Sequence, residues 1–188
     1  EGTAALDYIR WGEAQGYHER PSCRGRQRWW DVGKWEISWN ILPMFERERK
    51  YCFWNNARAF VDAALYWVYK PRVDDKVLNC YLNSTLFGLW KELMARPPEG
   101  GGGGPIQIKV YHYFEMPFPT ALSMLTSAQQ ECLYSVFDQM AYREIKSIFD
   151  EIHQPDRRAL DEVVFDVLGL TAGEREAVYE AVVNLVRA

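Results

Sequence analysis

Three arginines stand at alternate positions in the stretch CRGRQRWW (23–30), directly before two adjacent tryptophans. If this stretch is extended, Arg24, Arg26 and Arg28 point to the same side, because alternate side chains of a strand share a face. Each guanidinium can bind a phosphate, or the edge of guanine, through two hydrogen bonds at once. The spacing therefore predicts a surface that grips a polyanion, with Trp30 beside it.

Further basic and amide side chains extend this candidate DNA-binding set. Arginine and lysine supply phosphate contacts, and asparagine is the residue type that pairs with adenine edges. The predicted set comprises Arg24, Arg26, Arg28, Trp30, Lys34, Arg47, Arg49, Lys50, Asn55, Asn56 and Arg58. The alternative is that Trp29 and Trp30 are core anchors and that the arginines stack on them.

The charge of the chain is unevenly distributed. The formal net charge of −4 taken alone disfavours a nucleic-acid partner. Residues 20–72, however, contain eleven Lys or Arg against five acidic residues, whereas residues 73–188 contain ten against seventeen. This segregation predicts a segment that faces a polyanion on an otherwise acidic body.

Sequence signatures of an active site are missing. The five glycines at 100–104 follow ARPPE rather than a strand and match no phosphate-binding pattern, so we interpret them as a loop. The four cysteines are far apart without a CxxC pair, which predicts reduced thiols in a cytoplasmic protein. A zinc site using His18 and Cys23 lacks a second ligand pair. We predict no catalytic residue and no metal site.

The apolar stretches of the chain, such as 59–69, are too short to cross a bilayer. We therefore expect no membrane partner.

The first two-thirds of the chain predict mixed secondary structure. Residues 29–45 are rich in Trp and Ile and are interrupted by Gly and Pro, as short strands and turns are. The spacing of apolar residues over 75–95 predicts a buried helical face. Alternation of apolar and polar residues over 106–114 predicts a strand.

Helical periodicity dominates from about Ser127. Pro155 suits the first turn of a helix, Gly169 suits a helix end, and Thr171 with Glu174 forms a capping box. The helical segments are 127–141, 142–153, 155–170 and 171–188. The fold class is therefore α+β, with a sheet-containing module (1–125) followed by a helical segment (126–188) that packs on it.

Six stretches together carry a resemblance to a known family. In order, they are YIRWGE (8–13), the RxRWW stretch (26–30), FWNNARAF (53–60), YLNSTL (81–86), IQIKVYHYFEMPFP (106–119) after the glycine-rich break, and RRALDEVVFDVLGLTAGEREAVYEAVVNLV (157–186). The chain resembles the C-terminal target-recognition region of adenine-N6 DNA methyltransferases of the restriction–modification type. This family includes fused restriction–methylation enzymes and is related to type I specificity subunits.

The resemblance implies a DNA sequence-recognition region that grips double-stranded DNA while an adenine is flipped out and methylated. The family's cofactor loop and its Asn/Asp-Pro-Pro-Tyr/Phe motif do not occur, and MPFP (116–119) has no Asn or Asp before its prolines. The resemblance thus implies that S-adenosylmethionine belongs to the parent enzyme, whose catalytic methyltransferase domain lies in the same chain. We expect this chain to be a fragment, because it lacks a starting methionine and stops within a helical pattern.

Two other functions remain open at this stage. One is a protein-interaction module of a multi-subunit phage-defence or DNA-processing complex, docked through its acidic helical tail. The other is an intact small enzyme, which the missing motifs disfavour. Duplex-DNA binding with a steep salt dependence distinguishes a DNA-recognition region from both.

Overall fold

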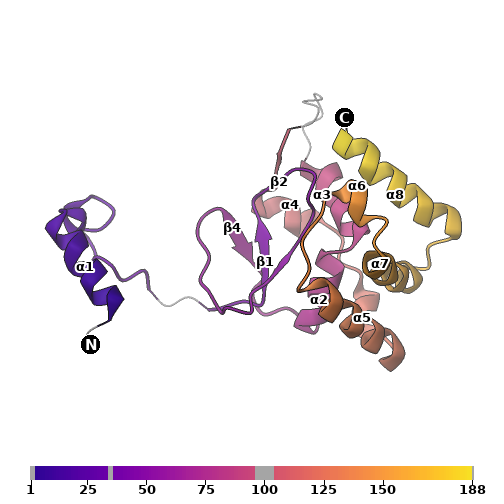
Figure 1. Ribbon diagram of the computed structural model, residues 1–188, viewed down its shortest axis with the longest axis horizontal. Helices are drawn as coiled ribbons and strands as arrows, with labels where there is room; N and C mark the ends of the chain where they lie inside the picture. The colour runs from indigo at the N-terminus through magenta and orange to yellow at the C-terminus, as the bar shows by residue number, and fades with distance from the viewer. Residues whose placement is uncertain (1–2, 34–35, 96–103, 188) are drawn as a thin grey trace. The chain divides into compact units, whose positions relative to one another are not determined.

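The computed structural model describes residues 3–33, 36–95 and 104–187 (Figure 1). These residues belong to two compact units, Glu1–Glu36 and Ile37–Ala188. The boundary predicted between residues 125 and 126 falls inside the second unit, where α2 (Asp75–Leu82) contacts α5 (Ser127–Met140).

The first unit is a helix with a folded-back loop. It contains α1 (Ala4–Ala14) and the 3-10 helix η1 (Tyr17–Glu19), followed by consecutive turns up to residue 30. The loop is fastened to the helix by Trp29, whose Nε1 donates to Oε1 of Glu13 at 3.2 Å. A Cβ added to Gly12 would lie 2.5 Å from the Trp29 ring. Glycine at this position therefore lets the indole reach the helix backbone.

The described part of the second unit contains two small antiparallel sheets. The first has the order β3-β1-β4, formed by β1 (Asn40–Pro43), β3 (Phe53–Trp54) and β4 (Leu65–Trp67). The second pairs β2 (Phe45–Glu46) with β5 (Ile106–Gln107). Within the first sheet, Ile41 lies opposite both Phe53 and Trp67. Its neighbour Leu42 points to the other face, where it joins the main core.

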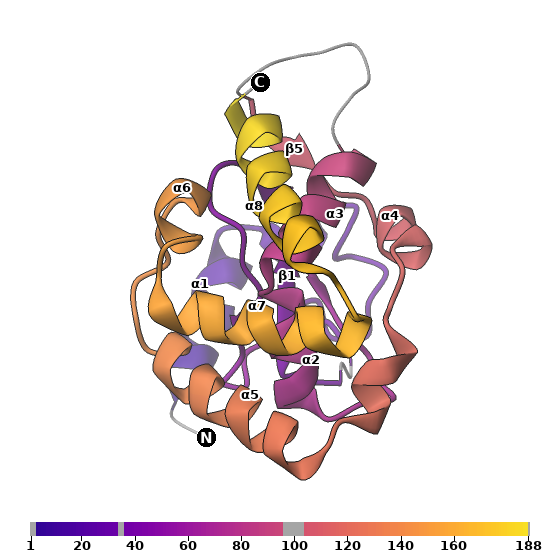
Figure 2. The same ribbon diagram turned by 90° about the vertical axis from the view of Figure 1, so that its right-hand side faces the viewer.

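Helices form most of the rest of this unit, and α2 packs against β1 of the first sheet. They are α2, α3 (Thr85–Ala95), α4 (Val110–Glu115), the 3-10 helix η2 (Thr120–Met124), α5, α6 (Ile148–Glu151), α7 (Pro155–Leu168) and α8 (Ala172–Arg187). Figure 2 shows α7 running above α5, with α8 above α7 and steeply inclined to it. Contacts of α5 with α7 and of α3 with α8 join the C-terminal helices to the rest of this unit.

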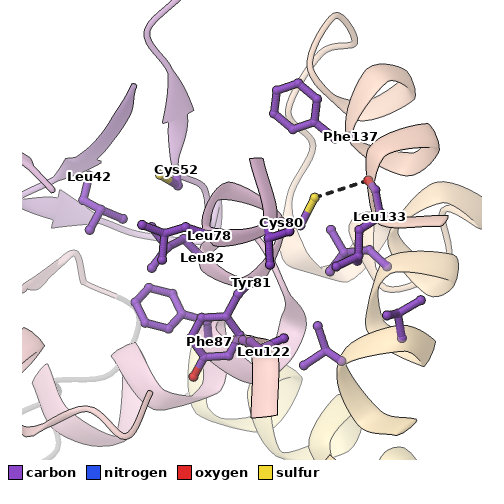
Figure 3. Close-up of a cluster of buried hydrophobic side chains, with 14 of the residues drawn as sticks. Leu42, Cys52, Leu78, Cys80, Tyr81, Leu82, Phe87, Leu122, Leu133 and Phe137 are labelled. Carbon is purple, nitrogen blue, oxygen red and sulfur yellow. Dashed lines mark hydrogen bonds between the residues drawn. The ribbon is translucent and has the colours of Figure 1, made fainter. Parts of the chain in front are cut away.

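The main core lies between β1 and the helices α2, α3, α5 and α7. Leu133 and Val164 are fully buried there, and the Cys80 thiol donates to the carbonyl oxygen of Leu133 at 3.4 Å (Figure 3). Burial raises the pKa of both Cys80 and Cys52 to about 12. Full burial of an aliphatic or aromatic side chain stabilises the folded state by roughly 1.5–3 kcal/mol. Because a thiol with a raised pKa stays protonated, Cys52 and Cys80 act as small apolar side chains of the core rather than as nucleophiles.

The predicted α+β class is confirmed, and so are three of the four predicted C-terminal helices, as α5, α7 and α8. Pro155 opens α7 in its first turn, and Gly169 ends it in the left-handed conformation with φ 69°. The Thr171 hydroxyl donates to the Glu174 carboxylate at 2.7 Å, and the same carboxylate accepts from the Thr171 backbone N–H at 2.8 Å.

The strand predicted over 106–114 is wrong beyond its first residues. Only Ile106–Gln107 pairs as a strand, and the buried Ile108 donates its N–H to the carbonyl oxygen of Met44 at 2.8 Å. The chain then turns into α4, which places Tyr113 against Tyr66 and Phe87. Tertiary packing of one aromatic ring therefore overrides the local alternation.

The helix predicted over 142–153 shortens to Ile148–Glu151. Its first residue donates the backbone N–H to the carbonyl oxygen of Glu48 at 2.7 Å, a tertiary partner rather than a helical one. In the described part of the chain, no helix has the length and apolar character needed to cross a membrane.

Candidate nucleic-acid interface

The arginine-rich loop of the first unit is a series of turns rather than the strand on which its common face was predicted. The Arg24 N–H donates to the carbonyl oxygen of Arg20 at 2.9 Å, and the Arg26 N–H donates to that of Cys23 at 3.0 Å. Turns nevertheless leave Arg24, Arg26 and Arg28 exposed. Their exposure therefore does not come from the alternation of a strand, and their role as a polyanion-binding surface stays a prediction.

The two tryptophans of this loop have different roles. Trp29 is partly buried against α1, as the anchor interpretation predicts. Trp30 is 41% exposed, and the Arg28 guanidinium carbon lies 5.5 Å from the centre of its ring. This geometry holds one guanidinium on a flat aromatic surface that is open to solvent.

The guanidiniums of this loop have no acidic partner within the described residues. Arg24, Arg26 and Arg28 form no ion pair there, although Arg26 donates to the main-chain oxygen of Asp31 at 3.4 Å. Cations that are exposed and unpaired keep their full charge for an external anion.

The second basic stretch, ERERK (46–50), is divided between the surface and the core. Arg47 and Arg49 are exposed, whereas Glu46 and Lys50 at its ends are both 3% exposed. The ammonium of Lys50 binds the Glu92 carboxylate of α3 and lies 3.9 Å from that of Glu46.

A second lysine completes this buried charge cluster, which we define as Glu46, Lys50, Lys91 and Glu92. The Lys91 Nζ donates to Glu46 Oε1 at 2.6 Å, and neither side chain is exposed. Burial lowers the pKa of Lys50, against the opposing effect of the two carboxylates. Since its charge is already neutralised inside the protein, we leave Lys50 out of the proposed DNA contacts.

The loop after β3 contains the predicted amide pair. Asn55 is buried, and its side chain donates to the carbonyl oxygens of Ser38 and Ala59 at 2.9 Å and accepts from the Ala59 N–H. It therefore shapes the loop, and we leave it out of the base-reading residues as well. Asn56 is exposed.

Arg58 lies on an aromatic stack in the same loop. Its backbone is left-handed with φ 54°, and its guanidinium carbon lies 4.3 Å from the centre of the Trp39 ring. Trp39 in turn stacks on Trp54, with the ring centres 4.8 Å apart. Asn56 and Arg58 are thus both exposed in this loop, whereas Lys34 lies outside the described residues.

Two further cations share the properties of the predicted set. Arg20 is exposed and sits over the Tyr17 ring at 4.5 Å, and Arg72 is exposed near the start of α2. Neither forms an ion pair within the described residues. Both arginines lie within residues 20–72, where basic residues are in excess. Neither belongs to a local motif, so the sequence alone did not indicate them as site residues.

Arginines of the C-terminal helices are bound to acids instead. Arg143 donates to both oxygens of Glu151 at 2.7 Å, and Arg157 donates to the same carboxylate at 3.2 Å. Burial alone would raise the pKa of Glu151, but these arginines outweigh it and lower the pKa to about 2. This part of the molecule therefore offers little net positive charge to a polyanion.

Within the second unit, three of the six stretches that carry the resemblance meet. Thr85, next to the LNS segment, donates its backbone N–H and hydroxyl to the carboxylate of Asp161 in the LDEVV run, at 2.8 and 2.5 Å. The Tyr81 hydroxyl donates to the carbonyl oxygen of Pro117 in MPFP at 2.9 Å. Asn83 pairs its amide with the backbone N–H and oxygen of Cys52, beside the edge strand β3. These stretches therefore build the scaffold that holds the loops.

Among the described residues, no group of three or more His, Cys, Asp or Glu side chains is placed to hold a metal ion.

Comparison with known families agrees with this arrangement. The fold is α+β, and three of the stretches that carry the resemblance to methyltransferase recognition regions form one scaffold in the second unit. The family described as type II methyltransferase M.Eco57I, C-terminal domain, matches residues 2–152, which include both basic stretches, and the chain belongs to this family. Comparisons with curated proteins and with solved structures gave no match.

Proposed function

We propose that this chain is the DNA sequence-recognition region of an adenine-specific DNA methyltransferase of the restriction–modification type. In this proposal it grips duplex DNA while a catalytic domain of the same protein flips out and methylates an adenine. Membership of a family of methyltransferase C-terminal domains supports the class of reaction. The DNA-gripping role is supported by the surface of the two basic stretches.

One observation carries the proposal. Within the described residues, eight arginines between positions 20 and 72 are exposed and form no salt bridge: Arg20, Arg24, Arg26, Arg28, Arg47, Arg49, Arg58 and Arg72. A folded protein with net charge −4 has acids enough to neutralise them. Leaving them unpaired costs repulsion among like charges, which a polyanion relieves by binding.

Salt dependence of binding tests this role. We expect the chain to bind duplex DNA with a logarithmic affinity that falls linearly with the logarithm of salt concentration, by about 0.9 per phosphate neutralised. The measurement is fluorescence anisotropy of a labelled duplex between about 50 and 200 mM salt. An affinity that does not change with salt would contradict the proposal and favour a protein partner.

The cofactor and the methyl transfer are assigned to the catalytic domain in this proposal. The sequence of this chain contains neither the cofactor loop nor the Pro-Pro motif of the family. We therefore expect calorimetry to detect no micromolar binding of S-adenosylmethionine by residues 1–188 alone. Binding at that level would place the cofactor site in this chain and overturn the assignment.

A further inference from the structure

A cavity of about 180 Å³ lies beside the edge strand β3, between that strand and the connection from α5 to α6. Aromatic rings line it from both sides, with Tyr51 and Phe53 at the strand and Tyr142 after α5. Trp54 and Phe137, in edge-to-face contact at 5.0 Å, also contribute to its walls. Pockets for drug-sized ligands measure about 300–1,000 Å³, so this cavity suits a single small ring system.

The charges at the cavity are already neutralised by one another. Arg143 binds both Glu151 and Asp156, and Arg157 binds Glu151. A phosphate or carboxylate entering here would have to displace an acid from a bidentate ion pair. The cavity therefore favours a flat, uncharged ligand over an anion.

Two hydrogen-bonding groups at the cavity are available to a ligand. The amides of Asn79 and Asn83 are bound to each other and to neighbouring backbone. By contrast, the Asn56 amide and the Tyr51 hydroxyl form no hydrogen bond with the other described residues, and Asn56 is exposed. An amide that offers both a donor and an acceptor matches the edge of a nucleobase.

We propose that this cavity accepts one nucleobase turned out of the DNA duplex, with aromatic rings against its faces and Asn56 at its edge. Proteins that bind extrahelical bases hold them in this way, by stacking and by hydrogen bonds to the base edge. Arg49 and Arg58, each two residues from a cavity residue in the sequence, are exposed and supply contacts for the flanking phosphates. The DNA source of the base rests on the proposed function, whereas the affinity for the ring does not.

A filled cavity provides the test. Ala141 lines the cavity and is exposed at the end of α5, so Ala141→Phe places a ring in the cavity without replacing a core side chain. Ala128 is exposed in the first turn of the same helix and does not line the cavity, which makes Ala128→Phe the matched control. Tyr51→Phe removes only a hydroxyl and provides a second variant with an unchanged fold.

In the first arm of the experiment, free adenosine or thymidine is added to the full chain. Binding is measured by changes in the backbone amide chemical shifts. We expect shifts at Tyr51, Phe53 and Asn56 that disappear in Ala141→Phe, persist in Ala128→Phe and weaken in Tyr51→Phe. Absence of shifts in the unmodified chain, or shifts that persist in a folded Ala141→Phe variant, would overturn the proposal.

Labelled duplexes form the second arm, one fully paired and one with a single bulged base. We expect the chain to prefer the bulged duplex by about 5- to 150-fold, the range given by stacking one base on an aromatic surface. Ala141→Phe should abolish this preference and leave the affinity for the paired duplex unchanged. Equal affinity of the unmodified chain for both duplexes would exclude DNA as the source of the base. If neither duplex binds, the proposed function fails, and the nucleoside arm alone decides the cavity.

Discussion

Arginines in two regions of the molecule have opposite surroundings. Between residues 20 and 72, eight are exposed and form no salt bridge among the described residues. Between residues 143 and 175, every arginine binds at least one acid, namely Arg143, Arg157, Arg158 and Arg175. Whether a guanidinium has an acidic partner therefore distinguishes the arginines that we propose for DNA binding from those that stabilise the fold.

Lys50 is the exception that sharpens this comparison. It belongs to the basic region by sequence, but the buried charge cluster places it with the internal braces. Burying four charges is expensive, and such a cluster is stable only while every charge keeps its partner. It holds both ends of the ERERK turn, and this leaves Arg47 and Arg49 at the surface.

The largest effect on stability should come from breaking this cluster. Lys91→Met leaves the buried Glu46 carboxylate without its partner at 2.6 Å. We expect the free energy of unfolding to fall by about 3–5 kcal/mol, measured by urea denaturation. The double variant Glu46→Leu/Lys91→Met removes both charges, so most of that loss should be recovered. A double variant as unstable as the single one would show that packing, and not charge, sustains this region.

A smaller loss should follow from Glu151→Gln. The substitution keeps the shape of the side chain but removes the charge that accepts hydrogen bonds from Arg143 and Arg157. Hydrogen bonds to charged groups are each worth about 1.5–3 kcal/mol, and Arg143 retains Asp156 as a second partner. We expect a loss of about 2–3 kcal/mol by urea denaturation, with duplex binding by the folded variant unchanged. A loss of DNA affinity in the folded variant would contradict the separation of the two regions.

The same carboxylate predicts an acid limb of stability. Its pKa falls from the ordinary value of 4.5 to about 2 on folding, so the folded state holds fewer protons there than the unfolded state. The stabilisation is fully present above pH 4.5 and disappears as the pH falls towards 2. Thermal unfolding between these pH values should therefore show a shallower decline for Glu151→Gln than for the unmodified chain. Parallel curves would exclude Glu151 as the titrating group.

Local signals made the C-terminal helices predictable from sequence. Pro155 opens α7 and Gly169 ends it, and Thr171 with Glu174 caps α8. Each signal acts within one or two helical turns, so no knowledge of the tertiary fold is needed to interpret it.

Features decided by distant partners were not predictable in this way. Lys50 resembles any other surface cation until α3 brings Glu92 to it. Residues 106–114 have the pattern of a strand, but from Val110 they form α4, where Tyr113 contacts Phe87 and Tyr66. The candidate site was therefore predictable as a charged segment, whereas the assignment of individual side chains required the tertiary structure.

The unpaired arginines should have the smallest effect on stability and the largest on DNA. In the triple variant of Arg24, Arg26 and Arg28 to Ala, each change should alter the free energy of unfolding by no more than about 0.5 kcal/mol, because the side chains are exposed. The salt slope of duplex binding should flatten by roughly 0.9 for each phosphate that is no longer neutralised, equally for cognate and scrambled duplexes.

Single variants of these arginines then separate gripping from reading. If one of these arginines binds a guanine edge, its replacement by Ala should weaken binding to the cognate duplex by about 1–3 kcal/mol. Binding to a scrambled duplex should change little. Arg10→Ala is the control, since Arg10 is exposed in the same unit but lies 3.9 Å from the Asp7 carboxylate. Its removal should leave the salt slope unchanged, because a guanidinium beside an acid contributes less charge to a distant phosphate. If the triple variant folds and binds both duplexes like the unmodified chain, the absence of a carboxylate partner does not mark the DNA face.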